Sequence, residues 1–331
     1  MKLILDAMSG DLGSAPAVEA AVRAVQELGL EVTLVGREAE IREKLTGRTA
    51  GITVVNASEV VDMHDAPTTV IRQKKDSSMV VALNLLAAGE GDALVSCGNT
   101  GALLTGATLL VKRIKGVRRA CLAAMMPTGA GHSLLLDCGA NAECTTEYLT
   151  QFAYMGYHYY RTEKGVERPT VGLLNNGAEE SKGTDLQKET YAVLKADADA
   201  GKINFIGNVE GWDIAQGAAN VLVADGFTGN LVLKTYEGVG LYLVSQMKAM
   251  FKKGPFTMLA ALLVKSGLMD LKKRMDYKEV GGAPLLGISK PVIKAHGGSD
   301  EIALFGAIRQ AVRYTEGGVV EAIAASLRAE V

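Results

Sequence analysis

The sequence predicts an α/β fold with a mostly parallel sheet covered by helices on both faces. Short apolar runs of strand length alternate with longer segments of helical period along most of the 331 residues. Such alternation is typical of βα units, whose parallel strands are buried on both faces. The 38 glycines show no fixed period and fit the tight turns between such units. We expect a three-layer α/β/α sandwich in a single continuous domain, residues 1–331, whose length also permits two lobes.

Each expected strand is an apolar run bounded by glycine or small polar residues. In chain order the strands span 2–6, 31–35, 52–56, 93–97, 120–126, 133–138, 170–175, 203–209 and 221–225. The expected helices have apolar residues at helical spacing and span 15–29, 37–45, 79–88, 100–112, 145–160, 184–196, 229–250 and 300–327. No linker, low-complexity segment or short repeat interrupts the series.

The composition is that of an ordinary globular protein. Apolar residues make up 48% and charged residues 22% of the chain, and the formal net charge is −2. A charge this close to zero argues against general nucleic-acid binding. Asp6 interrupts the first apolar run too early for a secretory signal, and no run approaches the roughly 20 apolar residues that span a bilayer. We therefore expect a cytoplasmic protein.

The cysteines and histidines do not predict a metal site. The four cysteines lack Cys-x-x-Cys spacing and the four histidines are scattered, so reduced thiols and no structural zinc are expected. Cys97 is the best-placed thiol, at a strand end. No histidine lies near it in sequence, and a buried, inert cysteine is the commoner case.

The most informative segment is 225–234, Asp-Gly-Phe-Thr-Gly-Asn-Leu-Val-Leu-Lys. It joins a buried strand to a long helix. Gly226 and Gly229 allow a tight turn, and Thr228 or Asn230 can cap the helix. A helix N-terminus of this kind presents backbone N–H groups that favour an anion such as phosphate.

Four other strand ends carry similar loops of small polar residues and glycine. They span 6–11, 97–101, 137–141 and 175–177. In an open parallel sheet, loops at the carboxyl ends of strands form the ligand site. Small residues also simply make tight βα turns, which is the alternative for any single loop. Five such loops, each with Asp or Asn, favour one shared polar site.

Common cofactor and nucleophile motifs are absent. The chain has no Gly-x-x-x-x-Gly-Lys-Ser/Thr, no Gly-x-Gly-x-x-Gly after a strand and no Gly-x-Ser-x-Gly. A dinucleotide cofactor is therefore not expected.

Two side chains and one turn are further candidates. Lys182 lies in a glycine-bordered loop, where it could reach phosphate as a point charge, although a surface lysine is the plainer alternative. His296 is the one histidine in a glycine-rich strand-end loop, with a structural role as its alternative. Residues 281–287 are expected to form a rigid small-residue turn.

Residues 112–119 form a basic segment without an acidic residue. It contains Lys112, Arg113, Lys115, Arg118 and Arg119. On a nearly neutral protein such a patch can steer an acidic partner. A solvated turn between a helix and a strand is the alternative.

Residues 251–280 break the α/β alternation. An apolar cluster contains Leu259, Leu262, Leu263 and Val264, and the basic residues Lys252, Lys253, Lys265, Lys272, Lys273 and Arg274 flank it. Two short amphipathic helices of this kind could lie on an anionic membrane. A helical hairpin packed on its own subunit or at a dimer interface is the alternative.

Nine motifs, in order, resemble those of the phosphate acyltransferases of bacterial phospholipid synthesis, the PlsX family, along nearly the whole chain. They span 6–11, 72–79, 98–102, 136–141, 180–183, 209–214, 225–230, 281–287 and 296–300. The resemblance implies transfer of a long acyl chain from acyl carrier protein to inorganic phosphate, which gives acyl phosphate. It also implies a fold similar to the isocitrate and isopropylmalate dehydrogenase superfamily, without the nicotinamide cofactor.

The resemblance further implies a homodimer that associates peripherally with the inner face of the cell membrane through the projection at 251–280. A glycerol-3-phosphate acyltransferase is the candidate recipient of the product, and no metal or other cofactor is expected.

The matched motifs define the expected site. We assign catalytic roles to Lys182, His296, Asn99 and Asp225. We assign substrate or phosphate binding to Asp6, Gly10, Gly98, Thr100, Gly101, Asp137, Asn141, Gly226, Thr228, Gly229 and Asn230. Because a thioester is already activated, the site needs only to position the reactants and stabilise an oxyanion. A phosphotransacetylase-like enzyme of small acids and a non-catalytic phosphoryl-ligand or membrane scaffold are the alternatives.

Overall fold

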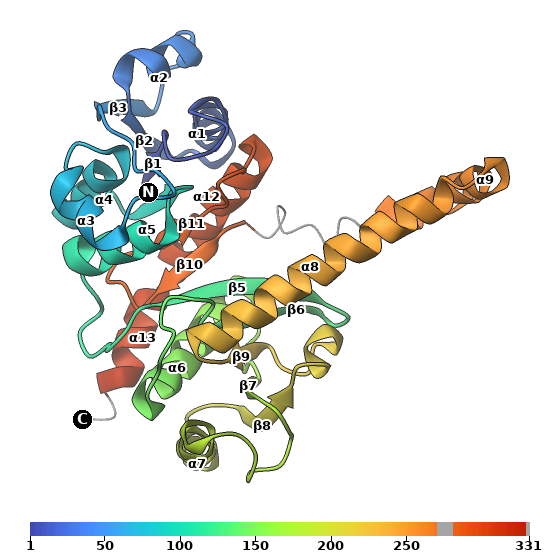
Figure 1. Cartoon of the computed structure of the whole chain (residues 1–331). Helices are drawn as coiled ribbons and strands as arrows, with labels where there is room; N and C mark the ends of the chain where they lie inside the picture. Colours follow the sequence, from blue (N-terminus) through green and yellow to red (C-terminus); the bar gives the residue numbers. More distant parts are fainter. Residues whose placement is uncertain (270–280, 329–331) are drawn as a thin grey trace.

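The computed structural model describes residues 1–269 and 281–328, and these residues form one sheet between two layers of helices (Figure 1). The strands are β1 (Lys2–Asp6), β2 (Glu31–Gly36), β3 (Ile52–Asn56), β4 (Ala93–Ser96), β5 (Cys121–Thr128), β6 (Gly131–Leu136), β7 (Val171–Asn175), β8 (Phe205–Glu210), β9 (Val221–Val223), β10 (Ala283–Leu286) and β11 (Val292–Lys294). Their order in the sheet is β3-β2-β1-β4-β11-β10-β5-β6-β9-β7-β8. The predicted α/β class with a mostly parallel sheet is confirmed.

The helices alternate with the strands as expected. They are α1 (Ala15–Leu28), α2 (Glu38–Leu45), α3 (Pro67–Gln73), α4 (Ser78–Ala88), α5 (Thr100–Gly106), α6 (Thr146–Lys164), α7 (Asp185–Asp199), α8 (Gly226–Phe251), α9 (Pro255–Leu263), α12 (Glu301–Glu316) and α13 (Val319–Arg328). A π-helical turn, Ala107–Val111, extends α5, and a 3-10 turn covers Asp213–Gln216.

Separate apolar cores lie on the two faces of the sheet. The larger core gathers side chains from α1, α2, α6, α12 and α13. A second core, on the opposite face, takes its side chains from α3, α4, α5 and the π-helical turn. A third, smaller core lies beneath β6, β7 and β9, where the first turns of α8 cover the sheet. Burial on both faces explains why the strands are apolar along their whole length.

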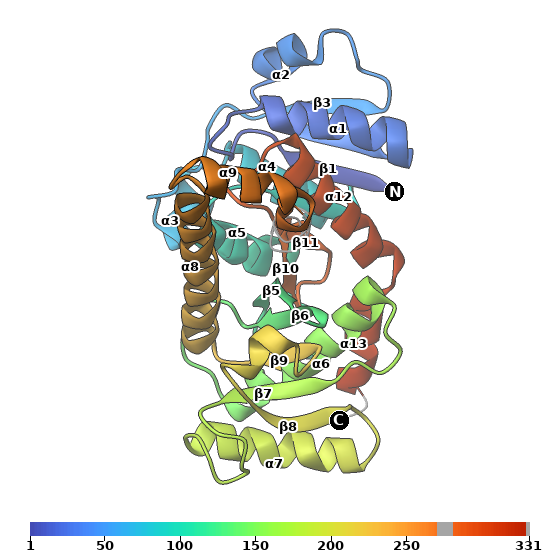
Figure 2. The ribbon, with the colours of Figure 1, turned by 90° about the vertical axis from the view of Figure 1, so that its right-hand side faces the viewer.

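The sheet joins two lobes whose parallel strands run in opposite senses. We call β1–β4, β10 and β11, with α1–α5 and α12, the first lobe, and β5–β9, with α6–α8 and α13, the second lobe. The reversal occurs because β10 is antiparallel to both β11 and β5, and β5 is antiparallel to β6. Neighbouring strands twist by roughly 20–25°, so the five steps from β4 to β9 rotate the sheet by about 100–125°. This twist turns the carboxyl end of β1 towards the side on which α8 begins (Figure 2).

The structure corrects several predicted elements. Residues 283–286 of the expected small-residue turn are strand β10, and α3 was not predicted. Helix α9 lies within 251–280, where short helices were expected, and β11 supplies the strand end expected before His296. The expected helix at 300–327 is two helices. It breaks because Gly318 takes a left-handed φ of 62°, which favours glycine. The expected helix at 100–112 changes to a π-helical turn at Ala107.

Helix α8 extends away from the body and carries α9 at its far end (Figure 1). Among its 26 residues only Gly226 and Gly229 are buried, and both lie in its first turns. Within the described residues no helix is long and apolar enough to cross a membrane. The last part of the predicted projection, 270–280, lies outside the described residues.

Candidate functional site

The five predicted loops lie in two groups, one in each lobe. The predicted loops after β1 and β4, together with the loop of His296 after β11, form the first-lobe group, and the predicted loops after β6, β9 and β7 form the second-lobe group. A single row along one parallel edge, as expected from the sequence, is therefore wrong, because the strand direction reverses between the lobes. The twist of the sheet nevertheless brings both groups to the α8 side of the molecule (Figure 2).

Asp6 organises the first-lobe group. Its side chain is buried and its Oδ2 accepts hydrogen bonds from Ser9 Oγ at 2.5 Å and Ser96 Oγ at 2.7 Å. Ser96 Oγ in turn accepts from the Gly98 N–H at 3.1 Å. A Cβ on Gly10 would lie 3.6 Å from Cys97 Cβ, so this loop runs close to the end of β4. Asp6 therefore fixes the loops of β1 and β4 against each other.

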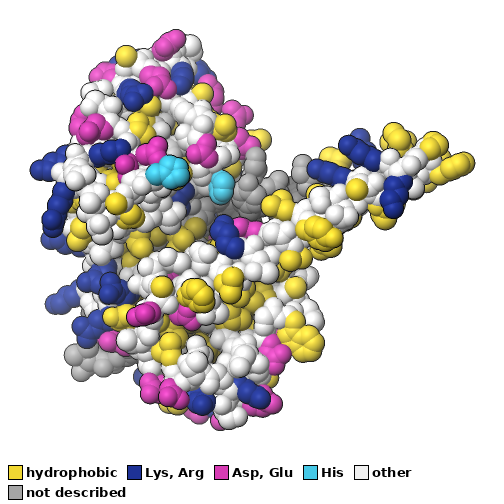
Figure 3. Space-filling model, in the orientation of Figure 1, with side chains coloured by type: hydrophobic (Ala, Val, Ile, Leu, Met, Phe, Trp, Pro, Cys, Tyr) yellow, Lys and Arg dark blue, Asp and Glu magenta, His cyan; other side chains and the backbone are white. Residues whose placement is uncertain are grey.

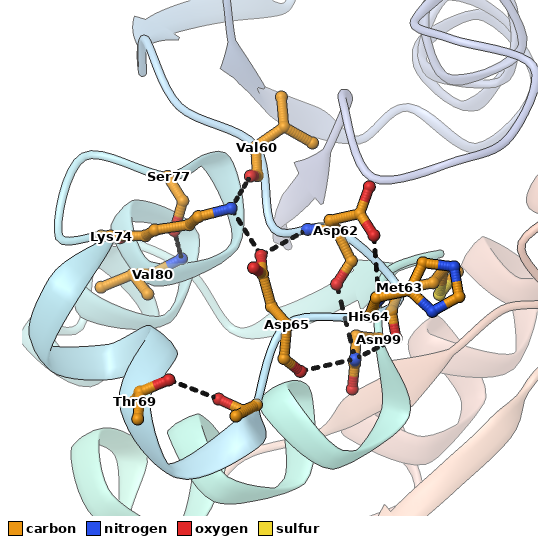
Figure 4. A network of polar contacts seen from close by, with 11 residues as sticks. Val60, Asp62, Met63, His64, Asp65, Thr69, Lys74, Ser77, Val80 and Asn99 are labelled. Atoms are coloured by element: carbon orange, nitrogen blue, oxygen red, sulfur yellow. Dashed lines mark hydrogen bonds and ion pairs between the residues drawn. The ribbon is translucent and has the colours of Figure 1, made fainter.

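Asn99 is committed to local structure (Figure 4). Its Oδ1 accepts from the Ala102 N–H at 3.0 Å, which caps α5, and its Nδ2 donates to Met63 O at 2.9 Å and Asp65 O at 3.3 Å. Lys74 Nζ donates to Asp65 Oδ2 at 2.5 Å and thereby ties the same loop to the end of α3. The Asn99 amide thus positions a loop, and its expected catalytic role has no support from these contacts.

Two further predicted residues begin this helix. Thr100 is its first residue and is exposed. A Cβ on Gly101 would lie 2.7 Å from Pro67 Cγ, so Gly101 lets α3 approach α5 closely.

His296 lies exposed in the loop after β11. Its Nδ1 accepts a hydrogen bond from the Gly298 N–H at 3.1 Å. A neutral ring with this contact carries its hydrogen on Nε2 and can donate a hydrogen bond from that atom. The carbonyl of the neighbouring Gly297 accepts a hydrogen bond from the Asp11 N–H at 2.8 Å, which joins this loop to the loop after β1.

Sequence analysis missed Lys294, the last residue of β11. It is in register with Ser96 on β4, and its largely buried ammonium donates to Cys97 O at 3.0 Å and also to Ala295 O. Burial lowers the pKa of Lys294, and electrostatic interactions with Cys97, Asp11 and Asp6 oppose that shift. The sequence signal that could have pointed to Lys294 is a lysine at the end of a short apolar run just before His296.

Asp137 organises the second-lobe group in the same way. Its fully buried carboxylate accepts from the backbone N–H groups of Leu122 at 3.0 Å, Ala140 at 3.2 Å and Asn141 at 2.7 Å. Burial raises the pKa of Asp137, while these hydrogen bonds and one from Asn141 Nδ2 oppose the rise. Asp137 therefore accepts hydrogen bonds from backbone N–H groups that the sequence analysis had expected to bind phosphate.

The loops after β6 and β9 interlock. The Gly226 N–H donates to Asn141 O at 2.7 Å, and Asn230 Nδ2 donates to Cys138 O at 2.9 Å. A Cβ on Gly229 would lie 2.0 Å from Asp137 O, so only glycine fits there. The two loops therefore form one rigid unit at the start of α8.

Asp225 caps α8 and uses both carboxylate oxygens to do so. They accept from the Thr228 N–H and from Thr228 Oγ1, each at 2.8 Å. Because the Gly226 and Thr228 N–H groups already have protein acceptors, the helix N-terminus offers few donors to an anion. A cation is needed to bind phosphate on this side of the molecule.

Lys182 supplies an exposed cation after β7. Its stem lies against Gly177, where a Cβ would be 2.7 Å from Lys182 Cγ, and its carbonyl accepts from Asn175 Nδ2 at 3.2 Å. Leu173 of β7 pairs with Val223 of β9, and Asn175 and Asp225 each follow two residues later on these two strands. The loop of Lys182 thus starts beside the α8 cap. No carboxylate of the described residues forms an ion pair with its ammonium.

The cysteines are poorly suited to nucleophilic chemistry. Burial raises the pKa of the Cys97 thiol to about 12 and that of Cys144 to about 11. Burial also raises the pKa of Cys121 and Cys138 well above the ordinary value. Because the thiolate is the nucleophile, covalent catalysis by these residues is disfavoured.

The basic segment 112–119 leads into the second-lobe group. Its five cationic side chains are exposed, whereas Ile114 and Val117 are buried. Arg118 pairs with Glu147 at 2.7 Å, and Arg119 lies over the ring of Tyr148 at 5.8 Å. The next carbonyl, that of Ala120, accepts from Asn141 Nδ2 at 2.8 Å, which places the patch beside the interlocked loops.

The far end of α8 carries the apolar cluster of the predicted projection. Phe256, Leu259, Leu262, Leu263 and Val264 are all exposed in this chain. Apolar side chains are visible at this tip with Lys and Arg side chains beside them (Figure 3). Lys272, Lys273 and Arg274, also expected to flank the cluster, lie outside the described residues.

Comparison with known proteins identifies the chain's relatives. A family model described as "Fatty acid synthesis protein" matches residues 1–322. A phosphate acyltransferase from Thermoanaerobacter pseudethanolicus is 45% identical over 324 residues, which cover 98% of this chain and 96% of the relative. A phosphate acyltransferase from Clostridioides difficile is 42% identical over 327 residues, which cover 98% of this chain and 95% of the relative.

Solved structures share the fold at low sequence identity. A phosphotransacetylase from Streptococcus pyogenes matches with a TM-score of 0.65 and 18% identity, covering 96% of this chain and 94% of that chain. A putative 4-hydroxythreonine-4-phosphate dehydrogenase from Salmonella typhimurium has a TM-score of 0.50 and 14% identity, covering 97% of this chain and 99% of that chain. At these identities the matches show the fold alone.

Proposed function

The chain belongs to the phosphate acyltransferase (PlsX) family, and we propose that it transfers a long-chain fatty acyl group from acyl carrier protein to inorganic phosphate. In this reaction a phosphate oxygen attacks the thioester carbonyl. The tetrahedral intermediate then expels the carrier thiolate and leaves acyl phosphate. The observation that carries the proposal is that the family model matches residues 1–322, which include the loops of both groups, and that the relatives match nearly the whole chain.

The site favours positioning and charge stabilisation over covalent catalysis. The carboxylates Asp6, Asp137 and Asp225 hold loops by accepting hydrogen bonds, and the thiols are largely protonated. Lys182 keeps an exposed ammonium beside the α8 cap, and His296 can donate from Nε2. We assign these two side chains to phosphate or to the oxyanion that develops on the thioester carbonyl.

The basic segment 112–119 supports the proposal that acyl carrier protein is the acyl donor. Lys112 and Lys115 have no ion pair within the described residues, and Arg118 is balanced by one glutamate. An acidic carrier docked on this patch lies beside Asn141, at the edge of the second-lobe group.

We propose further that the protein is a homodimer and lies on the inner face of the cell membrane through its projection. The exposed apolar side chains of α8 and α9 support both contacts. We place the fold in the isocitrate and isopropylmalate dehydrogenase superfamily, and we propose a glycerol-3-phosphate acyltransferase as recipient of the acyl phosphate.

A trapping assay tests the reaction. Purified protein is incubated with inorganic phosphate and palmitoyl carrier protein, and hydroxylamine converts any acyl phosphate to a hydroxamate. We expect palmitoyl hydroxamate and free carrier only when phosphate is present. Turnover of acetyl coenzyme A with no turnover of the palmitoyl carrier would assign the protein to the phosphotransacetylase-like enzymes that act on small acids. No turnover of either donor by folded protein would favour a non-catalytic role.

A further inference from the structure

Three residues on neighbouring strands of the first lobe form a buried polar row. Asp6 ends β1, Ser96 ends β4 and Lys294 ends β11, and these strands are adjacent and parallel. Ser96 and Lys294 are direct register partners, and Ser96 Oγ donates to Asp6 Oδ2 at 2.7 Å. Side chains in register on parallel neighbours lie on the same face of a sheet. A carboxylate, a hydroxyl and an ammonium are thus aligned at the carboxyl ends of the strands.

The ammonium of Lys294 has one more donor than the protein uses. It donates to Cys97 O and Ala295 O, and an ammonium carries three N–H bonds. No aspartate or glutamate of residues 1–269 and 281–328 lies within ion-pair distance of it. Since a buried charge is costly unless it is satisfied, the third N–H needs an acceptor. Asp6 does not supply one: it forms no hydrogen bond or ion pair with Lys294, and its oxygens accept from Ser9, Ser96 and the Met8 N–H.

Close backbone packing holds this ammonium in place. The Asp11 N–H donates to Gly297 O, and a Cβ on Gly297 would lie 2.7 Å from Asp11 Oδ2. A Cβ on Gly98 would lie 2.9 Å from Ser9 Cβ. The three loops around Lys294 therefore touch at glycines, where side chains would separate them.

We propose that Lys294, through its third N–H, is the residue that binds inorganic phosphate in the acyl-transfer reaction. This inference rests on the proposed function and assigns the acceptor substrate to the first lobe. Lys294 is fixed by two carbonyls, whereas Lys182 is exposed on a loop, so binding phosphate at Lys294 orders fewer side-chain rotamers. Lys182 then serves the oxyanion of the thioester. Asp6 and Asp11 balance the ammonium when phosphate is absent.

The test compares Lys294→Met with Lys290→Met. Lys290 donates to Gly91 O at 2.9 Å near the opposite end of β4, so its substitution removes the same charge and a similar carbonyl contact away from the loops. Phosphate binding is measured by calorimetric titration with inorganic phosphate, without turnover, and phosphate and carrier KM are measured separately. We expect phosphate affinity to fall about 10- to 100-fold in Lys294→Met, the scale of one charged hydrogen bond. Carrier KM should stay unchanged, and Lys290→Met should bind phosphate as the wild type does.

Two measurements cover the case in which Lys294→Met does not fold. Lys294→Arg keeps the charge and should retain most of the phosphate affinity. In the wild type, phosphate binding should weaken as the pH rises, before the pH reaches the ordinary lysine pKa of 10.5, because burial lowers the pKa of Lys294. The titratable groups that interact with the Lys294 ammonium are Cys97, Asp11 and Asp6, and the Cys97 thiol, with a pKa of about 12, stays protonated over that range.

The outcomes separate this inference from the proposed function. Wild-type phosphate affinity in folded Lys294→Met, or an equal loss in Lys290→Met, overturns the assignment of Lys294 and leaves acyl transfer intact. Constant wild-type phosphate affinity up to pH 10 also overturns it. A wild type that binds phosphate through Lys294 and yet makes no acyl phosphate overturns the proposed function instead.

Discussion

Replacing Lys112 by glycine should stabilise this protein. Lys112 has φ 74° and ψ 165°, a backbone conformation that is essentially restricted to glycine. Both of its backbone groups are held there, because its N–H donates to Ala107 O at 2.9 Å and its carbonyl accepts from the Ser289 N–H at 2.9 Å. The side chain is exposed, so its removal costs little packing.

The expected gain follows from two opposing terms. A residue held in such a region costs about 1–3 kcal/mol, which glycine removes. Glycine also makes the unfolded chain more flexible, which costs about 0.4–1 kcal/mol. The net gain is therefore about 0.5–2 kcal/mol. With an unfolding entropy of roughly 2.1 cal/mol/K per residue, this gain raises the Tm of a 331-residue chain by about 1–3 °C.

Urea unfolding and differential scanning calorimetry measure the effect. Lys115→Gly is the matched control, because Lys115 is an exposed lysine of the same segment and its φ is not positive. Lys115→Gly should lower stability slightly. If Lys112→Gly lowers the urea midpoint as much as Lys115→Gly does, the strain at Lys112 is absent and the reasoning fails. Lys112→Gly should also raise the carrier KM modestly, because it removes one charge from the basic segment.

Three further predictions concern the site and its partners. Lys182→Ala should cut turnover by about 10²–10³-fold, the scale of one oxyanion donor, with little change in Tm; a wild-type rate in the folded variant would remove Lys182 from the mechanism. The double variant Arg113→Glu with Lys115→Glu should raise the KM for the carrier and weaken the salt dependence of that KM, but it should spare activity on a carrier-free acyl thioester. An equal loss of activity with both acyl donors would contradict docking of the carrier on this segment. Leu259→Glu with Leu263→Glu should abolish flotation with anionic vesicles and leave an active dimer, whereas sedimentation of an inactive monomer would assign these residues to the dimer contact.

Local sequence patterns were sufficient for most of the fold. Apolar runs of strand length and helical spacing placed the nine predicted strands and most helices within a few residues of their observed bounds. The pattern failed where elements were short: β10 has four residues and includes Pro284, and β11 has three. Such short runs lack the length over which periodicity can be recognised. In the structure the side chains of Ser77, Thr145 and Asp300 cap α4, α6 and α12, at or near the predicted starts of these helices.

The sequence alone determined which loops are polar, and the tertiary structure decided what each polar side chain does. Asn99 and Asp225 have the residue types of a catalytic site, but their contacts are those of helix caps. Lys294 ends an unremarkable short run, and only its register with Ser96 places it beside the buried Asp6. The reversal of strand direction through β10 and β5 was equally invisible in the sequence. The reason is physical: periodicity is a local property of the chain, whereas the partner of a charged or polar group comes from strands distant in sequence.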